Sequence, residues 1–312
     1  MSFKNVTVAG GGVLGSQIAY QAAYKGFNVT VWLRSEGSIE RAKPKFARWH
    51  KIYLDTLEAM KTNPAAYARG LADSPKLSAE EIDALKAKAD AAYENLKLTT
   101  AYDEAGADAD LVIEAIAEDP KQKEDFYTEL AKHLPEKTVI CTNSSTLLPS
   151  QLAASTGRPE KFLALHFANS IWKNNTAEVM GHADTDQQYY DEVVEFAKEL
   201  GMVPLPLKKE QPGYILNSML VPFLNSAEML LAKGVADPET IDKTWMLATG
   251  APVGPFRILD IVGLTTAYNI VIMDPRSKDP ESIQGKIAAT LKEYIDAGKL
   301  GVNAGEGFYK YN

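Results

Sequence analysis

The chain has 312 residues, 46% hydrophobic and 24% charged, which is typical of a globular protein large enough for two domains. Its net charge of −8 argues against nucleic acid or an anionic membrane as the main partner. The single cysteine, Cys141, excludes an intrachain disulfide and fits a reducing cytoplasm. Because the four histidines are not clustered either, we expect no metal site.

The N-terminal residues 1–5 lead almost at once into an apolar strand, so we expect no signal peptide. No apolar run approaches the roughly 20 residues that cross a bilayer. We therefore expect a cytoplasmic protein that does not bind membranes.

A glycine-rich turn follows the first predicted strand, at 6–9, and precedes a helical pattern. Gly10, Gly12 and Gly15 have glycine-x-glycine-x-x-glycine spacing. The first glycine permits a tight turn, the second lets the backbone approach a pyrophosphate, and the third lets helix pack closely on strand. The helix N-terminus favours phosphate. The turn therefore predicts NAD or NADP binding by Gly10, Gly12, Val13, Leu14 and Gly15.

Strands and helices alternate over the first two thirds of the chain. The further strands are predicted at 29–33, 96–99, 111–116, 138–142, 162–167, 176–180 and 202–207. This alternation predicts a Rossmann-type, doubly wound, mostly parallel α/β sheet. After the second strand, residues 36–96 read as a helical insertion, with helices at 38–60 and 78–96. Ser78 and Glu81 form a capping box that starts the second of these.

The pattern changes near residues 208–213 and is helical beyond them. We therefore expect a dinucleotide-binding domain at 1–208 and an all-α C-terminal domain at 209–312. The stretch 219–224 is apolar on more than one helical face, which suggests burial on two sides. The sequence thus predicts a homodimer that forms through the C-terminal domain.

Three polar clusters follow or interrupt strands, at the sheet edge where open parallel sheets bind ligands. They are Asn143–Thr146, His166 and Glu178. Cys141, by contrast, lies in an apolar strand as an expected core residue. Taken alone, His166 is either a satisfied core histidine or a catalyst. A buried carboxylate needs a partner, and imidazole is the natural one for Glu178.

The chain resembles the 3-hydroxyacyl-CoA dehydrogenase family over nearly its whole length. The segments that carry this resemblance are the turn at 10–15, Glu114–Glu118 with Lys123, Asn143–Ser145, Leu165–Phe167, Pro212–Asn217, Gly254–Phe256 and Gly305–Lys310.

The resemblance implies that His166 is the general base for the substrate 3-hydroxyl, and the acid in the reverse direction. It implies that Glu178 orients the imidazole, and that Ser145 and Asn217 hydrogen-bond the reacting oxygen. Cofactor contacts are implied for Glu118, Lys123, Asn143 and Asn169.

Simpler roles remain open for several of these residues. Asn217 and Ser145 are both suited to helix capping. Glu118 and Lys123, without the family match, would be read as solvent-facing charges.

The end of the second strand departs from the family pattern. Members that prefer NAD place there an aspartate that binds the ribose hydroxyls, whereas this chain has Leu33, Arg34 and Ser35. An arginine and a hydroxyl suit a 2′-phosphate, so Arg34 and Ser35 favour NADP. The alternative is that Arg34 stacks on adenine and Glu36 serves the ribose.

Three further departures concern the substrate. The segment after His166 contains Ala168 and Ser170 and is polar, which argues against a long acyl chain. The inserted helix carries a basic cluster that suits either coenzyme A phosphates or solvent. Its members are Arg41, Lys43, Lys45, Arg48 and Lys51. Asn303 stands where members commonly have a cofactor-binding lysine.

The resemblance therefore implies an NAD(P)-dependent oxidoreductase that interconverts a short 3-hydroxyacyl-CoA and its 3-oxo form. An alternative keeps the chemistry but acts on a free 3-hydroxy acid, a sugar acid or a diketone. A third is a non-catalytic, crystallin-like dinucleotide-binding protein. The presence of His166, Glu178, Ser145 and Asn217 together argues against the third.

Overall fold

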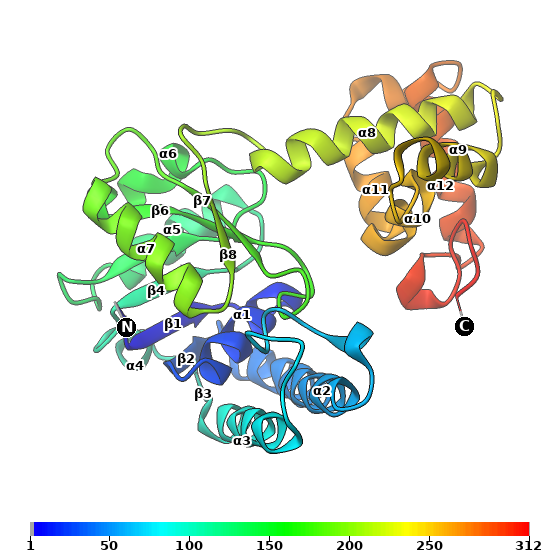
Figure 1. The fold of residues 1–312 in the computed structure, drawn as a ribbon. Helices are drawn as coiled ribbons and strands as arrows, with labels where there is room; N and C mark the ends of the chain where they lie inside the picture. Colours follow the sequence, from blue (N-terminus) through cyan, green and yellow to red (C-terminus); the bar gives the residue numbers. More distant parts are fainter. Residues whose placement is uncertain (1–2, 312) are drawn as a thin grey trace. The chain divides into compact units, whose positions relative to one another are not determined.

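The computed structural model describes residues 3–311 of the chain. The chain divides into two compact units, of which the first ends at Ile215 and the second begins at Leu216 (Figure 1). The domain boundary expected after residue 208 lies a few residues before this division of the chain and stays a prediction.

The first unit is built on an eight-stranded sheet with the order β3-β2-β1-β4-β5-β6-β7-β8. All neighbouring strands are parallel except β6 and β7. This confirms the predicted mostly parallel sheet. The strands are β1 (Asn5–Ala9), β2 (Asn28–Trp32), β3 (Lys97–Thr99), β4 (Leu111–Glu114), β5 (Val139–Thr142), β6 (Phe162–Phe167), β7 (Thr176–Met180) and β8 (Val203–Pro206).

Helices connect the strands of this unit. They are α1 (Val13–Tyr24), α2 (Glu36–Met60), α3 (Ala79–Asn95), α4 (Tyr102–Gly106), α5 (Pro120–Leu130), α6 (Pro149–Leu152) and α7 (Gln187–Glu199). The predicted insertion after β2 is confirmed, and its helices α2 and α3 pack on each other and on α1. The Ser78 hydroxyl accepts the Glu81 N–H, and the Glu81 carboxylate accepts the Ser78 N–H, so the capping box is confirmed.

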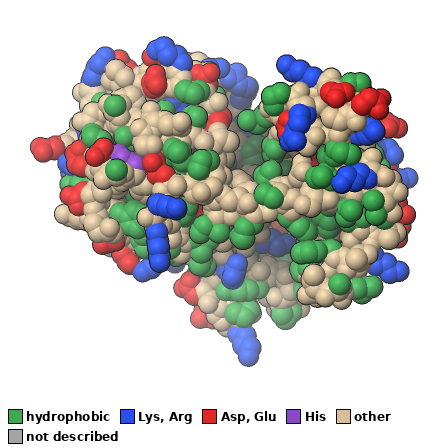
Figure 2. Space-filling model, turned by 90° about the horizontal axis from the view of Figure 1, so that it is seen from above, with side chains coloured by type: hydrophobic (Ala, Val, Ile, Leu, Met, Phe, Trp, Pro, Cys, Tyr) green, Lys and Arg blue, Asp and Glu red, His purple; other side chains and the backbone are tan. Residues whose placement is uncertain are grey.

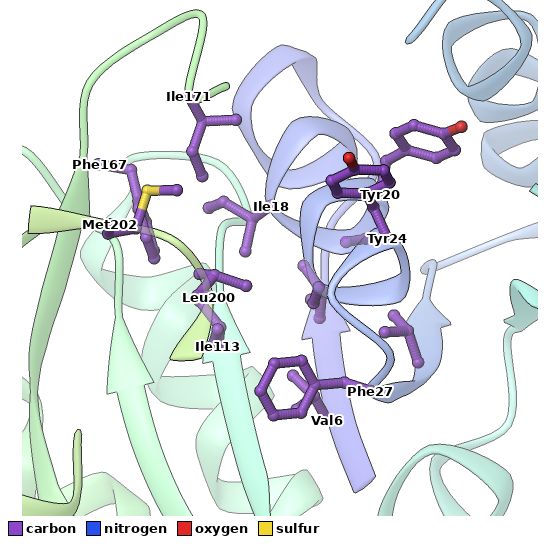
Figure 3. Packing of buried hydrophobic residues seen from close by; sticks show 14 of the residues in the cluster. Val6, Ile18, Tyr20, Tyr24, Phe27, Ile113, Phe167, Ile171, Leu200 and Met202 are labelled. Atoms are coloured by element: carbon purple, nitrogen blue, oxygen red, sulfur yellow. The ribbon is translucent and has the colours of Figure 1, made fainter. Parts of the chain in front are cut away.

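Alternate residues of a strand point to opposite faces of the sheet, and in the central strands β4, β5 and β6 all of them are buried, so both faces are covered there. Val6 and Val8 belong to the larger core, to which α1, α2 and α7 contribute. Figure 3 shows part of this core, with Val6 of β1 and Ile18 of α1. Ala9 belongs to the core on the other face, to which α5 contributes. Cys141 is fully buried in the larger core, as expected.

The second unit is helical in the part of the chain that the structure describes, which confirms the predicted all-helical C-terminal region. Its helices are α8 (Tyr214–Ala232, whose first two residues belong to the first unit), α9 (Pro238–Thr249), α10 (Pro255–Val262), α11 (Leu264–Val271) and α12 (Ile283–Asp296). Short 3-10 turns in the chain cover Pro64–Ala66, Ala153–Thr156, Pro159–Lys161, Pro275–Lys278 and Val302–Ala304. The buried Asp260 carboxylate accepts the N–H groups of Phe308 and Tyr309, which ties the C-terminal segment to α10.

Helix α8 corrects the expectation that no apolar run approaches the length of a bilayer span. It spans 19 residues with a mean hydropathy of 1.3, so by length and composition it is long and apolar enough to cross a bilayer. Apolar side chains on it, including Met219, Val221 and Leu230, are exposed within the chain. Figure 2 shows one face of the molecule, on which hydrophobic side chains gather between charged ones. An interface helix of a globular oligomer has the same length and exposure as a membrane span, so α8 alone carries no membrane assignment.

Burial raises the pKa of the Glu228 carboxyl on α8 to about 7. The folded state therefore holds this proton more tightly than the unfolded chain, and stability falls as the pH rises from about 4.5 to about 7. We expect Glu228→Gln to raise the free energy of unfolding by roughly 3 kcal/mol at about pH 8 and to change it little at about pH 4.5. Urea unfolding at the two pH values measures this.

The control is Glu281→Gln, because the Glu281 side chain in the same unit is 88% exposed. This variant should follow the unmodified chain at both pH values. An equal effect of Glu228→Gln at both values would show that the carboxyl of Glu228 does not titrate in this range.

Candidate functional site

The glycine turn has the geometry that its spacing predicts. Gly10 has a φ of +115°, and a Cβ at this position would lie 2.4 Å from the carbonyl oxygen of Ala115. A Cβ on Gly15 would lie 2.3 Å from the carbonyl oxygen of Gly10, whereas one on Gly12 would meet nothing within 4 Å. The turn is thus closed at its first and third glycines and open at the second, where a pyrophosphate approaches the backbone.

A cleft of about 630 Å³ lies at the carboxyl ends of β1, β2 and β4. Arg34, Arg41 and Lys45 line it beside the glycine turn, and the Lys45 ammonium donates to the Gly11 carbonyl at 2.7 Å. The Trp32 indole N–H also belongs to the lining, and it is buried without a hydrogen-bond partner among residues 3–311. A cationic cleft at this edge of the sheet fits a dinucleotide.

The two serines near the start of α2 have different positions. The Ser35 hydroxyl accepts the Ser38 N–H at 3.3 Å and caps α2, whereas Ser38 lines the cleft. The Arg41 guanidinium donates to the Ser38 hydroxyl at 2.8 Å. Sequence reasoning singled out Ser35, missed Ser38 and placed the start of this helix at residue 38. The helix begins at Glu36, so Ser35 is its N-cap.

A second cleft, of about 280 Å³, joins the glycine turn to the carboxyl ends of β4 and β5. Most of the predicted cofactor residues line it, together with one predicted catalytic residue. These are Gly12, Val13, Leu14, Gly15, Glu118, Lys123, Asn143 and Ser145. The fold therefore brings together side chains from the turn, from the segment after β4 and from the segment after β5.

Lys123 is buried, contrary to its reading as a solvent-facing charge. Its side chain is 1% exposed, and its ammonium lies 2.6 Å from the Glu114 carboxylate and 3.4 Å from that of Glu118. Glu114 is fully buried and also accepts from the Tyr127 and Thr142 hydroxyls. In this network the buried carboxylate and the buried ammonium contact each other, so neither lacks a partner of opposite charge.

Glu118 holds the loop that follows β5. One of its carboxylate oxygens accepts the N–H groups of Ser145 and Thr146 and the hydroxyls of Ser144 and Thr146. Burial alone would raise the pKa of Glu118, but the hydrogen bonds from Ser144 and Thr146 and the charge of Lys123 outweigh burial and lower the pKa. Glu118 therefore stays ionised and fixes the backbone that carries Ser145.

His166 lies between a carboxylate and a hydroxyl. In the antiparallel pairing of β6 and β7, His166 is directly opposite Glu178, and its Nδ1 lies 3.0 Å from the Glu178 carboxylate. Its Nε2 lies 3.1 Å from the Ser145 hydroxyl. The Glu178 contact makes Nδ1 the donor, so Nε2 is left as the basic nitrogen, facing Ser145. The side chains of His166 and Glu178 are 7% and 4% exposed.

The three predicted asparagines are in different places. The Asn143 side chain accepts the Phe167 N–H at 3.1 Å and so links the end of β5 to the end of β6. Asn169 is exposed, and its carbonyl accepts the Asn174 side-chain amide. Asn217 lies on α8, in the second unit of the chain.

A larger cleft, of about 800 Å³, lies at the amino ends of β1 and β2, lined by Asn5, Asn28 and Asp108. Open parallel sheets bind their ligands at the carboxyl ends of the strands, so we place the candidate site at the glycine turn.

Sequence reasoning also missed Tyr214. Its ring stacks on the His166 imidazole, with centroids 4.3 Å apart and planes at 12°. It is a non-glycine residue with a positive φ, which no sequence pattern signalled.

A Rossmann-type cleft, with a histidine–carboxylate pair that contacts Ser145 of its lining, is the arrangement of an NAD(P)-dependent oxidoreductase. The model for the 3-hydroxyacyl-CoA dehydrogenase NAD-binding domain matches residues 5–211, and that for the C-terminal domain of the same enzymes matches residues 213–311. The chain belongs to the 3-hydroxyacyl-CoA dehydrogenase family.

Individual relatives differ in their sequence identity to this chain. The mitochondrial hydroxyacyl-coenzyme A dehydrogenase of Rattus norvegicus is 33% identical, over 99% of this chain and 91% of that protein. A solved diketoreductase is 49% identical with a TM-score of 0.84, and the match covers 100% of both chains. The (S)-3-hydroxybutyryl-CoA dehydrogenase of Ralstonia eutropha is 28% identical with a TM-score of 0.75, over 99% of each chain.

The buried ammonium of Lys123 yields a prediction. Lys123→Met would leave the Glu114 carboxylate buried without its cation, so we expect the free energy of unfolding to fall by roughly 3–5 kcal/mol. Urea unfolding at about pH 7 measures this. The control is Lys121→Met on the same helix, whose ion pair with Asp125 is exposed and should contribute little to stability. Equal losses in both variants would contradict the proposed weight of the Lys123 pair.

Proposed function

We propose that this chain interconverts the hydroxyl and carbonyl forms of a small diketone or free 3-oxo acid, rather than of a coenzyme A thioester. The observation that carries this proposal is the 49% identity to a diketoreductase over the whole of both chains, against 28–33% for the coenzyme A dehydrogenases. A short 3-hydroxyacyl-CoA is the competing substrate, and the family membership supports it.

The basic cluster of α2 supports a substrate without coenzyme A. The cluster does not form one cationic face. Arg41 and Lys45 line the cleft of about 630 Å³ beside the glycine turn, which we call the nucleotide cleft. Lys43 pairs with Glu40, and Lys51 pairs with Asp55. Fewer cations than expected are thus directed toward the phosphates of a coenzyme A.

The loop after β6 offers a compact, polar surface. Gln17 accepts the Ser170 N–H at 2.9 Å, and Ile171 and Trp172 are buried in the core of the first unit. The exposed side chains of this loop are Asn169, Lys173 and Asn174, none of which is apolar. This arrangement suits a short polar substrate.

The chemistry that we propose follows from the two nitrogens of His166. The Glu178 carboxylate holds Nδ1 as a donor and stabilises the charged imidazolium, so that Nε2 takes the proton of a substrate hydroxyl or returns it to the carbonyl. Ser145, hydrogen-bonded at Nε2, holds the reacting oxygen there, and we assign Asn217 to the same oxygen. When bound, a nicotinamide would accept or supply the hydride at the substrate carbon that bears this oxygen.

We further propose that the cofactor is NADP(H). Arg34 follows β2, at the position where an acidic residue would repel a 2′-phosphate. Arg34, Ser38 and Arg41 all line the nucleotide cleft. A phosphate dianion placed there meets guanidinium groups and a hydroxyl. The contact of Arg41 with Ser38 directs this guanidinium toward the cleft.

The exposed apolar side chains of α8 support a homodimer that forms through the second unit, as the sequence predicts. A monomeric mass in solution would contradict this. The contacts of His166 with Glu178 and Ser145 support catalysis over a storage role, because dinucleotide binding alone needs none of them.

The substrate is tested with NADPH and NADH against pentane-2,4-dione, acetoacetate and acetoacetyl-CoA. We expect kcat/KM to be highest for the diketone or the free acid. A higher kcat/KM for acetoacetyl-CoA would overturn the proposed substrate class and favour the short acyl thioester. His166→Ala should lower kcat roughly 10²- to 10⁴-fold on the preferred substrate while nucleotide binding persists. The control, His182→Ala, removes an imidazole that contacts the Pro159 carbonyl and should leave kcat unchanged.

The cofactor is tested by the ratio of kcat/KM with NADPH to that with NADH. We expect this ratio to favour NADPH and to fall roughly 10- to 100-fold in Arg34→Asp, because a charged hydrogen bond to the 2′-phosphate is replaced by repulsion. The matched control is Lys51→Asp, the same change of charge at an exposed position of α2. A native preference for NADH would refute the assignment.

A further inference from the structure

We propose that Tyr214 is a positioning residue for the acid–base pair, holding the His166 imidazole and the Ser144–Ser145 backbone in their working arrangement. This inference rests on the proposed function of His166, and it assigns a role to a residue at the end of the first unit.

The first observation is the contact itself. Tyr214 is 1% exposed, and its ring lies nearly parallel to the imidazole, with centroids 4.3 Å apart. The edge of the imidazole is held by Glu178 on one nitrogen and by Ser145 on the other. Two edge contacts leave rotation about the axis between them, and a ring stacked on the face of the imidazole opposes that rotation.

The second observation is the phenol hydroxyl. It donates to the Ser144 carbonyl at 2.7 Å, in the loop whose next residue supplies the hydroxyl at Nε2. Burial, together with the charges of Glu118 and Glu178, raises the pKa of Tyr214. The phenol therefore keeps its proton and remains a donor. One side chain thus contacts both the acid–base group and the loop that carries Ser145.

The third observation is the backbone. Tyr214 has a φ of +54°, directly after Gly213 with a φ of +79°. Backbone geometry alone would favour glycine or asparagine at such a position. The unfavourable conformation turns the next peptide so that the Ile215 N–H donates to Glu178 at 2.9 Å. Strain at a residue that contacts functional groups indicates a role for its side chain.

The experiment compares Tyr214→Phe, which keeps the ring, with Tyr214→Gly, which suits the left-handed backbone but removes the ring. Turnover is followed with NADPH and the compound of the above panel that reacts fastest. We expect kcat to fall roughly 10- to 100-fold in Tyr214→Gly, because a displaced imidazole no longer meets the substrate hydroxyl correctly. Tyr214→Phe should lower kcat only about three- to ten-fold, since the stacked ring remains and only the hydrogen bond to the Ser144 carbonyl is lost. The Kd of NADPH should change little in either variant.

The matched control is Tyr24→Ala. Tyr24 is also buried, and its hydroxyl donates to the Leu71 carbonyl at 2.9 Å, so its loss creates a similar cavity. This variant should lower the melting temperature but leave kcat unchanged. Wild-type kcat in Tyr214→Gly, or equal losses of kcat in Tyr214→Gly and Tyr24→Ala, would overturn the inference. So would a loss of kcat in Tyr214→Phe as large as that in Tyr214→Gly, because the stacked ring would then contribute nothing.

The His166→Ala variant separates this inference from the proposed function. If His166→Ala keeps full turnover, the proposed acid–base role itself fails. If His166→Ala is inactive and Tyr214→Gly is fully active, only the role of Tyr214 fails.

Discussion

The antiparallel register of β6 and β7 is the constraint on which the site depends. It sets His166 opposite Glu178, on the same face of the sheet and within hydrogen-bond distance. A slip of one residue would turn Glu178 to the other face of the sheet and leave a buried carboxylate without this imidazole. The polar pair and the apolar neighbours Leu165 and Val179 therefore favour the same register. The pairing that builds the sheet is thus also the one that orients the imidazole.

A second set of buried charges supports the loop that meets His166. Lys123 lies between the carboxylates of Glu114 and Glu118, and Glu118 in turn holds the loop that carries Ser145. Such a network is stable only when every charge has a partner, because an isolated ion in the protein interior is costly. It also connects the cleft beside the glycine turn to His166, the proposed acid–base group, through consecutive hydrogen bonds. Rigid placement of Ser145 follows from this arrangement.

The fold could be predicted from the sequence because its signals are local: strands alternate with helices, and the glycine turn joins the first of each. The pairing of His166 with Glu178 was also accessible, since a carboxylate in an apolar strand needs a partner. The burial of Lys123 was not, because a lysine on a polar helix reads as exposed until the position of Glu114 is known. Tyr214 could not be found either, since its role depends on a positive φ and on a ring far away in sequence. The distinction between Ser35 and Ser38 likewise depends on which hydroxyl caps α2.

The hydride chemistry does not select the substrate. By their names, the similar proteins act on coenzyme A thioesters or on dicarbonyl compounds, and the structures among them share this fold. The histidine, its carboxylate and the glycine turn serve any hydroxyl beside a nicotinamide, so they cannot distinguish these substrates. Selection must come from side chains that surround the reacting carbon and the phosphates, namely the loop after β6 and the cations of α2. In this chain that loop buries its apolar residues and exposes Asn169, and two of the cations line the nucleotide cleft. The proposals of an additional phosphate on the cofactor and of a small polar substrate thus both rest on this edge of the sheet.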